Sequence, residues 1–192
     1  MSPLVLASTS RYRRELLERL KIPFEAVAPE VDETPRSPET PLGRAQRLAL
    51  AKAEAVSRRF PQARVIGSDQ VAVCKGEVLD KPGTAERCRQ QLRRLSAATA
   101  SFHSAVAIVP AAGQAPIQFV DTTTVYFRTL ERDEIDRYIE AEAPFDCAGG
   151  FRAEALGISL LSRVVSEDPT SLIGLPLIAL ARALRQLGYA LP

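Results

Sequence analysis

The stretch "VIGSDQVAVCKGEVLDKP", residues 65–82, decides the fold prediction. It opens with two β-branched residues that predict a buried strand, and Gly67 marks a position where the substrate or a neighbouring strand approaches the backbone closely. We expect this strand to end at Asp69 and a hairpin to follow, with its tip at residues 75–76. An isolated aspartate at a strand end more often caps a turn than takes part in chemistry. Its role therefore depends on the rest of the chain.

Composition predicts a globular chain without a nucleic-acid partner. The 192 residues are 46% hydrophobic and 25% charged, and the formal net charge is only +2. The paired arginines fall on separate predicted helices, where a solvated face is the usual explanation. We expect one domain over residues 1–192.

The number and spacing of cysteine and histidine residues limit the disulfides and metal sites that the chain can form. The three cysteines are widely spaced, which argues against a disulfide framework and for a reducing compartment. The single histidine, His103, leaves no His-rich metal cage and is expected to be a packed structural residue. No apolar run is long enough to cross a bilayer and no signal peptide pattern is present, so we expect a cytoplasmic protein with no membrane partner.

Helical and strand patterns alternate along the chain. The order mixes crossover helices with hairpins, which predicts an α/β fold around a mixed sheet. The loop after residue 33 is punctuated by prolines and is expected at the surface. The expected elements are a strand in "PLVLAS", a helix in "STSRYRRELLERLKI" capped by Ser8 or Ser10, a helix over about 42–60, a helix from Thr84, strands over 99–109 and 117–128 joined through "PAAGQAP", a helix in "ERDEIDRYIEAE", two short extended pieces within 145–165, and a closing helix in "GLPLIALARALRQLG".

The segment "LASTSRYRRELL" is a candidate anion site. A strand, a hydroxyl-rich turn and a helix start follow one another, and the free N–H groups at a helix start attract anions. Arg13 and Arg14 oppose the helix dipole, which favours acids in the first turn. Two guanidiniums beside Ser8 would suit a polyphosphate. A surface helix with stray arginines is the better explanation if this motif stands alone.

Acidic and basic residues elsewhere suit phosphoanhydride hydrolysis. That reaction needs oxygen ligands for Mg²⁺, a base that orients water and cations that offset charge on the leaving group. Glu33 and Asp69 could supply the first two, and Lys52 and Lys81 the third. Each of these side chains alone is more often a solvated surface group, so the prediction rests on their occurring together.

The motifs "LASTSRYRRELL", "VDET", "LALAKA", "GSDQV" and "KP", in this order, resemble the Maf family of nucleotide pyrophosphatases. The resemblance extends through the closing "GLPLIALARALRQLG" and is narrower still to the bacterial subfamily that acts on 7-methyl-GTP. It implies a fold like that of the inosine-triphosphate pyrophosphatases, with a mixed sheet and two lobes flanking a deep cleft. It also implies hydrolysis between the α and β phosphates with a divalent metal, Mg²⁺ or Mn²⁺, and a nucleoside triphosphate as substrate.

The resemblance also implies roles for individual residues. Asp69 would be the proton acceptor, with Lys52 and Lys81 completing the catalytic charge cluster. Glu33 and Asp69 would bind the metal. The phosphates would be held by Ser8, Arg13 and Arg14.

Three positions are expected to set base preference: Tyr12, Gln70 and Glu154. Relatives that prefer pyrimidine triphosphates tend to carry Arg, Thr and Gln there. N7-methylation makes guanine cationic, and an aromatic face attracts a cation by roughly 0.5–2 kcal/mol, so Tyr12 could stack on the methylated base. Glu154 could accept hydrogen bonds from the guanine edge while its charge offsets that of the ring. Arg11 departs from the proline that the subfamily often has at this position.

Two other readings stay open at this point. The chain could be a dTTP or UTP pyrophosphatase of the same family. It could also be a nucleotide-binding regulator of septum formation without turnover, although a water-activating carboxylate favours catalysis. The sequence does not give the oligomeric state, and a homodimer is one option.

Overall fold

The structure, a computed structural model, describes residues 2–111 and 114–192. The chain forms two compact units. Unit 1 comprises residues 1–70, 103–121 and 168–192, and unit 2 comprises residues 71–102 and 122–167. The connection predicted through residues 110–116 includes residues 112 and 113, which lie outside the described part.

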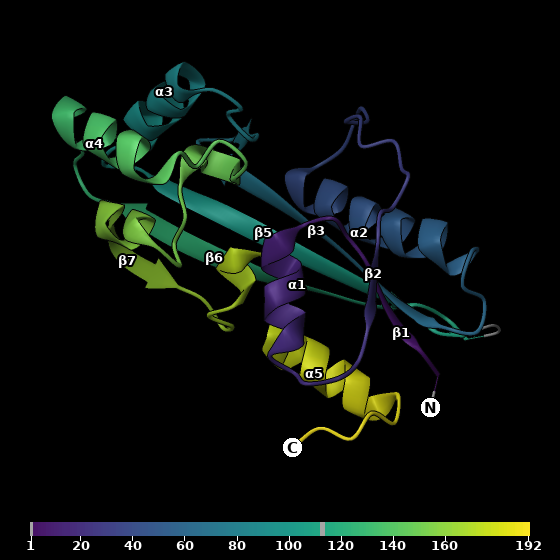
Figure 1. Cartoon of the computed structure of the whole chain (residues 1–192). Helices are drawn as coiled ribbons and strands as arrows, with labels where there is room; N and C mark the ends of the chain where they lie inside the picture. Colours follow the sequence, from purple (N-terminus) through teal and green to yellow (C-terminus); the bar gives the residue numbers. More distant parts are fainter. Residues whose placement is uncertain (1, 112–113) are drawn as a thin grey trace. The chain divides into compact units, whose positions relative to one another are not determined.

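Helices and strands follow the predicted α/β order (Figure 1). Unit 1 contains β1 (Leu4–Ala7), α1 (Arg11–Glu18), β2 (Glu25–Val27), α2 (Pro41–Ser57), the 3₁₀ helix η3 (Ser171–Ile173) and α5 (Leu177–Gln186). Unit 2 contains β4 (Glu77–Leu79), α3 (Ala85–Leu95), α4 (Arg132–Glu142), the 3₁₀ helices η1 (Ala148–Gly150) and η2 (Leu156–Leu160), and β7 (Leu161–Val165). Three strands contribute residues to both units, namely β3 (Arg64–Cys74), β5 (Thr99–Val109) and β6 (Ile117–Phe127).

The strands form the mixed sheet that the sequence predicts. Their order is β2-β1-β3-β5-β6-β7, and β4 pairs with β3. Pairing is parallel between β1 and both β2 and β3, and antiparallel for β3 with β4 and for β6 with β7. The predicted neighbours β5 and β6 do lie side by side. The mixed α/β class is therefore confirmed.

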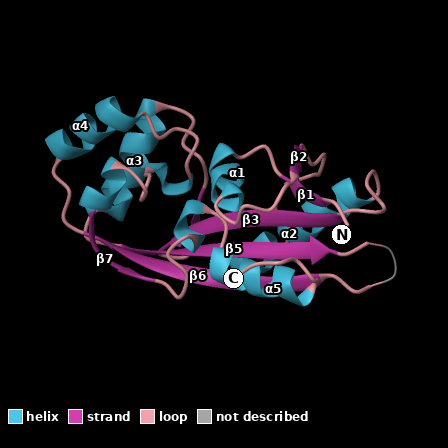
Figure 2. Cartoon of the chain, turned by 60° about the horizontal axis from the view of Figure 1, so that its bottom comes forward, coloured by secondary structure: helices cyan, strands magenta, loops and turns pink. Residues whose placement is uncertain are grey.

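Helices cover both faces of the strands of unit 1. Side chains alternate between the faces of a strand, and the even-numbered Leu4, Leu6 and Ile66 join a buried cluster with α1 and α5. The odd-numbered Gly67 instead faces α2. Figures 1 and 2 show α1 and α5 on one side of these strands and α2 on the other. Consecutive residues of β3 therefore serve different faces of the sheet.

The prediction that the central strand ends at Asp69 is wrong. Strand β3 continues to Cys74, so Asp69 lies within it. The alternation carried on by Val71 and Val73 keeps the backbone extended and paired with β4. The hairpin itself is confirmed, because Lys75 and Gly76 connect β3 to β4 with φ values of 52° and 80°.

The capping residues determine where the helices begin. Ser10, not Ser8, is the N-cap of α1, and its hydroxyl accepts a hydrogen bond from the Arg13 amide. Thr84 caps α3 as predicted. Pro41 is the first residue of α2, where its missing N–H costs nothing, so the proline-rich loop ends one residue earlier than its prolines suggest.

Unit 2 has its own aromatic core. The ring of Phe151 packs edge-to-face against Phe102 and Phe127, with centroid distances of 5.5 and 5.1 Å. The prediction of two extended pieces within 145–165 is only partly right, because η1 and η2 precede a single strand, β7. Glycines permit this, since Gly149 and Gly150 adopt φ values of 75° and 69°.

Among the described residues, no helix combines the length and the apolar character that crossing a bilayer requires. The three cysteines are free thiols, as predicted.

Candidate active site

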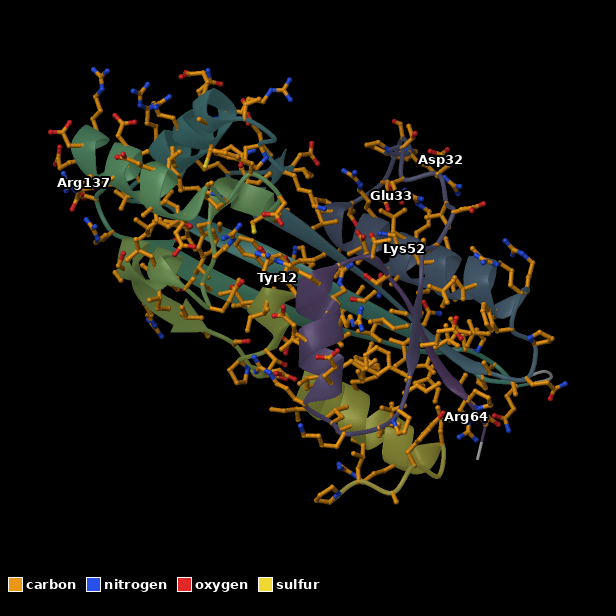
Figure 3. The ribbon with its side chains drawn as sticks, viewed as in Figure 1. Tyr12, Asp32, Glu33, Lys52, Arg64 and Arg137 are labelled. Atoms are coloured by element: carbon orange, nitrogen blue, oxygen red, sulfur yellow. The ribbon has the colours of Figure 1, made fainter. Side chains whose placement is uncertain are left out.

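A buried lysine lies between two carboxylates in unit 1. The Nζ atom of Lys52 is 2.7 Å from Oδ1 of Asp69 and 2.8 Å from Oε1 of Glu33. The side chains of Lys52 and Asp69 are 8% and 11% exposed, whereas that of Glu33 is 55% exposed. Figure 3 shows Glu33 and Lys52 next to each other at α2. The structure thus brings together three of the predicted residues, from a loop, a helix and a strand.

Gly67 explains how the helix reaches the strand. A Cβ atom on Gly67 would lie 2.1 Å from the carbonyl oxygen of Ala49 and 2.6 Å from the amide nitrogen of Ala53. Gly67 and Asp69 share one face of β3, and Ala53 is next to Lys52 on α2. The close partner of Gly67 is therefore α2, not the substrate or neighbouring strand that the sequence suggested. The missing side chain lets α2 lie directly against β3 and brings Lys52 to Asp69.

Arg13 lies within the electrostatic field of the same carboxylates. Burial lowers the pKa of its guanidinium from the ordinary value, and the charges of Asp69 and Glu33 oppose that shift. Its Nε atom donates to the carbonyl oxygen of Gly174 at 3.0 Å. Ser68 donates its hydroxyl to that same carbonyl at 3.1 Å.

No motif in the sequence pointed to this role of Gly174. Its backbone φ of 126° is one that residues with a side chain rarely adopt. A glycine between η3 and α5 was the available signal for an unusual backbone conformation at this turn.

Arg14 takes a different direction from Arg13. Its side chain is 64% exposed, and its Nε atom pairs with Glu18 one turn along α1 at 3.2 Å. Consecutive helical residues point about 100° apart, so both arginines of the pair cannot face the same side of α1. The structure brings Arg13 but not Arg14 toward the carboxylates of Asp69 and Glu33.

The turn between β1 and α1 organises Ser8. This side chain is buried, and its Oγ atom accepts a hydrogen bond from the Ser10 amide at 3.1 Å. The hydroxyl oxygen thereby fixes the turn that leads into α1. Ser8 is therefore held at the strand end that the anion-site hypothesis requires.

Tyr12 already has a cation on its ring. The guanidinium carbon of Arg11 lies 4.7 Å from the ring centroid, and Arg11 also donates to the Tyr12 hydroxyl at 2.9 Å. Half-buried Tyr12 lies in the first turn of α1 (Figure 3). The departure from proline at position 11 thus adds a positive charge beside this ring.

Gln70 points to the face of β3 opposite Asp69. Its Nε2 atom donates to the Ser104 hydroxyl at 2.9 Å and to the carbonyl oxygens of Ser171 and Leu172 at 3.1 Å. The Ser104 hydroxyl in turn donates to the Ser171 carbonyl at 2.7 Å. The Gln70 amide group is therefore engaged in holding η3.

Lys81 and Glu154 belong to unit 2. Lys81 is exposed in the segment between β4 and α3, and Glu154 is exposed in the turn between η1 and η2. Asp80 directly precedes Lys81, and its carbonyl oxygen accepts a hydrogen bond from Gln91 at 2.9 Å. Within unit 2, a backbone contact therefore anchors the start of the "KP" segment to α3.

The carboxylates suit a divalent metal that also binds phosphate. Mg²⁺ is usually held by one or two protein carboxylates together with substrate oxygens and water. Glu33 and Asp69 each place an oxygen within hydrogen-bonding distance of one nitrogen, so the two carboxylates converge on one point. No group of three or more potential ligands occurs among residues 2–111 and 114–192. The donor set thus fits a metal that arrives with a nucleotide.

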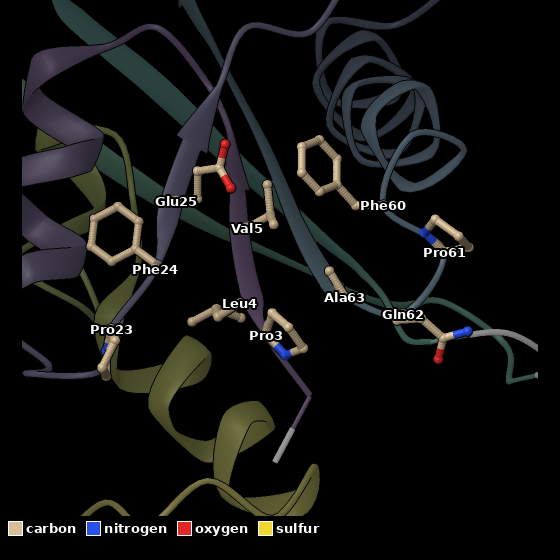
Figure 4. Close-up of a pocket in the computed structure, with 10 residues that line it drawn as sticks. All are labelled: Pro3, Leu4, Val5, Pro23, Phe24, Glu25, Phe60, Pro61, Gln62 and Ala63. Atoms are coloured by element: carbon tan, nitrogen blue, oxygen red, sulfur yellow. The ribbon is translucent and has the colours of Figure 1, made fainter.

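A separate hollow in unit 1 includes none of the predicted site residues. Its volume is about 480 Å³, and it lies along β1 with Phe24 on one side and Phe60 on the other (Figure 4). Its lining is mainly apolar and has no basic side chain. A triphosphate would find no charge partner there.

Comparison with known proteins places these residues in a family. A family model described as Maf-like protein matches residues 3–187. The chain is 54% identical over 192 residues to a protein of Xanthomonas axonopodis pv. citri, with 100% of both chains covered. It is 55% identical to one of Aromatoleum aromaticum, covering 100% of this chain and 98% of the relative. A third relative, from Bordetella pertussis, is 52% identical over 96% of this chain and 92% of its own length. All three are named 7-methyl-GTP pyrophosphatase. The chain that gathers Glu33, Lys52 and Asp69 in this way is a member of the Maf family.

Proposed function

We propose that this protein is a nucleotide pyrophosphatase that hydrolyses 7-methyl-GTP to 7-methyl-GMP and diphosphate. Full-length relatives at 51–55% identity carry the name of this activity. The observation that carries the proposal is the buried contact of 2.7 Å between Lys52 and Asp69, with Glu33 on the same lysine. A carboxylate enclosed beside a fixed cation is a typical arrangement for activating water.

In this proposal Asp69 accepts the proton of the attacking water. Its Oδ1 atom is occupied by Lys52, and within the described residues its Oδ2 atom accepts no hydrogen bond. A water molecule held by Oδ2 would give a proton to that oxygen as the water oxygen bonds to phosphorus. The bridging P–O bond between the α and β phosphates would then break, which gives 7-methyl-GMP and diphosphate. Lys52 holds the Asp69 carboxylate in place before the reaction, and Asp69 is also fixed because it projects from the middle of a strand.

Divalent metal binding is assigned to Glu33 and Asp69. Mg²⁺ or Mn²⁺ at these carboxylates would supply charge neutralisation for the phosphate oxygens. Lys52 is close enough to contribute positive charge to the same region.

The phosphates are assigned to Ser8, Arg13 and Arg14, with Lys81 as a further cation. Arg13 is the best supported, because it shares an electrostatic environment with both carboxylates. Arg14 would have to leave Glu18 to reach a phosphate. An exposed pair of this kind contributes only about 0–1 kcal/mol, so that rearrangement costs little.

Base preference is assigned to Tyr12, Gln70 and Glu154. Tyr12 would stack on the cationic methylated guanine, and Glu154 would bind the guanine edge. Gln70 would act indirectly by holding η3, because its amide donates to two backbone carbonyls there. We further propose a cytoplasmic protein with the nucleotide as its partner and no role for nucleic acid or membrane. A homodimer is compatible with this proposal.

A substrate comparison tests the function. Initial rates with 7-methyl-GTP, GTP, dTTP and UTP should be measured with Mg²⁺ and with Mn²⁺. We expect the highest kcat/KM for 7-methyl-GTP, and 7-methyl-GMP and diphosphate as the products. Equal or higher values for dTTP or UTP would reject the proposed substrate, and binding without turnover of any nucleotide would favour a regulatory protein.

Specificity variants complete this test. Tyr12→Arg combined with Glu154→Gln should lower the ratio of 7-methyl-GTP to UTP turnover, since it removes both the aromatic face and the negative charge. Arg137→Gln in unit 2 provides a control, because this arginine of α4 belongs to no proposed site. An unchanged ratio in the double variant would reject these two assignments.

A further inference from the structure

Glu33 lies on a loop that is exposed over most of its length. Residues 32–38 are exposed, and the contact of Glu33 with Lys52 is made by a side chain that is itself 55% exposed. Water and salt reach an exposed carboxylate and screen its interactions. The contact with Lys52 therefore holds the loop through a side chain that is partly solvated.

A second contact fixes this loop to α2. The Nε and Nη2 atoms of Arg47 donate to the two carboxylate oxygens of Glu39, at 2.5 and 3.0 Å. These side chains are only 18% and 12% exposed. Bidentate pairing of this kind is directional and stronger than a single contact. The hydrogen bonds to Arg47 lower the pKa of Glu39 to about 2, so this carboxylate is ionised at neutral pH.

The same arginine reaches the residue next to Glu33. Its Nη2 atom donates to the carbonyl oxygen of Thr34 at 3.3 Å. On the other side of Glu33, the Asp32 carboxylate accepts a hydrogen bond from the Thr34 amide at 2.9 Å. The backbone on both sides of Glu33 is therefore held by short-range contacts that Arg47 ties to the helix carrying Lys52.

From this geometry we propose that Arg47 and Glu39 are positioning residues. They fix Glu33 next to Lys52, where Glu33 is proposed to bind the metal. The hydrogen bonds of Arg47 go to Glu39 and to the Thr34 carbonyl, so its effect on Glu33 would pass through the loop. The inference rests on the proposed function for the role of Glu33. Neither Arg47 nor Glu39 belongs to the motifs that resemble the family.

Two substitutions with opposite charge changes separate positioning from simple electrostatics. Arg47→Met removes a positive charge, which by charge alone would strengthen binding of a divalent cation, and Glu39→Gln removes a negative charge, which would weaken it. If the contact positions Glu33, both variants should weaken binding. Partners that orient metal ligands typically change affinity by about 10- to 100-fold, so we expect at least about a tenfold loss in each variant.

Mn²⁺ binding provides a readout that does not depend on turnover. The probe is Mn²⁺ titrated into the full chain by electron paramagnetic resonance, with and without a non-hydrolysable 7-methyl-GTP analogue. Hydrogen exchange should speed up over residues 33–40 in both variants. Arg89→Met is the matched control, since Arg89 forms a comparable pair with Asp136 in unit 2 at 2.6 Å and should leave Mn²⁺ affinity unchanged.

A double variant tests whether the effect passes through Glu33. Adding Arg47→Met to Glu33→Gln should weaken Mn²⁺ binding no further than Glu33→Gln alone. Additive losses, opposite signs for Arg47→Met and Glu39→Gln, or unaltered Mn²⁺ affinity in both would overturn the inference. If Arg47→Met does not fold, Glu39→Gln with and without Glu33→Gln decides the question. If 7-methyl-GTP is not the preferred substrate but both variants bind Mn²⁺ more weakly as expected, the proposed substrate is rejected. The positioning role of Arg47 and Glu39 is then still supported.

Discussion

Lys52 and Asp69 form a buried ion pair, with 2.7 Å between Nζ and Oδ1, although one residue lies on a helix and the other in the middle of a strand. Such a pair is stable only while both charges are present, because each would otherwise be left uncompensated in a poorly solvated place. The close packing of α2 on Gly67 enforces the contact. The packing of α2 on β3 thus sets the distance between Lys52 and Asp69.

Replacing Asp69 by asparagine should reduce turnover without preventing binding. The amide keeps the shape of the side chain but cannot accept a proton, and loss of a general base typically costs about 10²–10⁴ in rate. We expect kcat for 7-methyl-GTP to fall by that factor while the Kd for a non-hydrolysable analogue, measured without divalent metal, changes little. Asp136→Asn, at a partly exposed pair in unit 2, serves as the control. Normal turnover in Asp69→Asn would remove this residue from the mechanism.

Replacing Lys52 by methionine should destabilise the protein more than replacing both partners. Removing one member of a buried pair costs about 3–5 kcal/mol, whereas neutralising both avoids an uncompensated charge. Urea unfolding of Lys52→Met, Asp69→Asn and the double variant gives the coupling energy. A double variant as unstable as the sum of the single changes would show that the two charges do not stabilise each other.

Alanine at position 67 should disturb the packing of α2. The new Cβ atom would meet backbone atoms of Ala49 and Ala53 at 2.1 and 2.6 Å, which no side-chain rotation can relieve. Overpacking of this kind costs about 1–3 kcal/mol or more, and the shift should also lengthen the Lys52 contact and lower activity. Thermal unfolding and kcat can be compared with Gly43→Ala, where the added atom meets only the Thr40 hydroxyl oxygen at 3.1 Å. A larger effect at position 43 would contradict this account.

The two neighbouring arginines should differ in importance. Arg13→Gln removes a guanidinium that feels the charges of both carboxylates, whereas Arg14→Gln removes an exposed partner of Glu18. We expect the loss of kcat/KM for 7-methyl-GTP to be at least about tenfold larger for Arg13→Gln, since each tenfold factor corresponds to about 1.4 kcal/mol of transition-state stabilisation. Similar losses would mean that Arg14 leaves Glu18 when the nucleotide binds.

Acid should destabilise the fold through His103. Burial lowers the pKa of its imidazole below 6.5, so the folded state favours the neutral ring. The unfolded chain then takes up a proton at a higher pH than the folded protein, and stability falls as the pH drops below 6.5. The free energy of unfolding should decrease between pH 7.5 and 5.5, and His103→Gln should flatten that slope. Glu39 stays ionised over this range, because its pKa is about 2.

Local patterns predicted much of the fold. Turn residues located the hairpin at Lys75 and Gly76, and the threonine cap located the start of α3. The end of β3 was missed because an acidic residue is unfavourable in a strand, whereas residues beyond Asp69 continue the strand and pair with β4.

The sequence predicted which types of residue form the candidate site, but not which way their side chains point. Asp69 and Gln70 are adjacent in sequence, yet they serve opposite faces of β3. Arg13 and Arg14 likewise point to different sides of α1, and nothing in the sequence says which of them faces the carboxylates. The pairing of Arg47 with Glu39 depends on the path of a loop, which propensities do not specify.

The division of the chain has a consequence for its synthesis. Every residue of unit 2 has been made once residue 167 is joined to the chain, whereas unit 1 still lacks residues 168–192, including α5 and Asp168, whose carboxylate accepts a hydrogen bond from the Ile178 amide at 2.6 Å. On the ribosome, unit 1, which carries Asp69, would therefore be the last to complete its folding. Until then, the apolar side chains of β1 and α1 that will cover α5 remain without their final neighbours, so a pause in translation near residue 167 would expose them to chaperones or to aggregation.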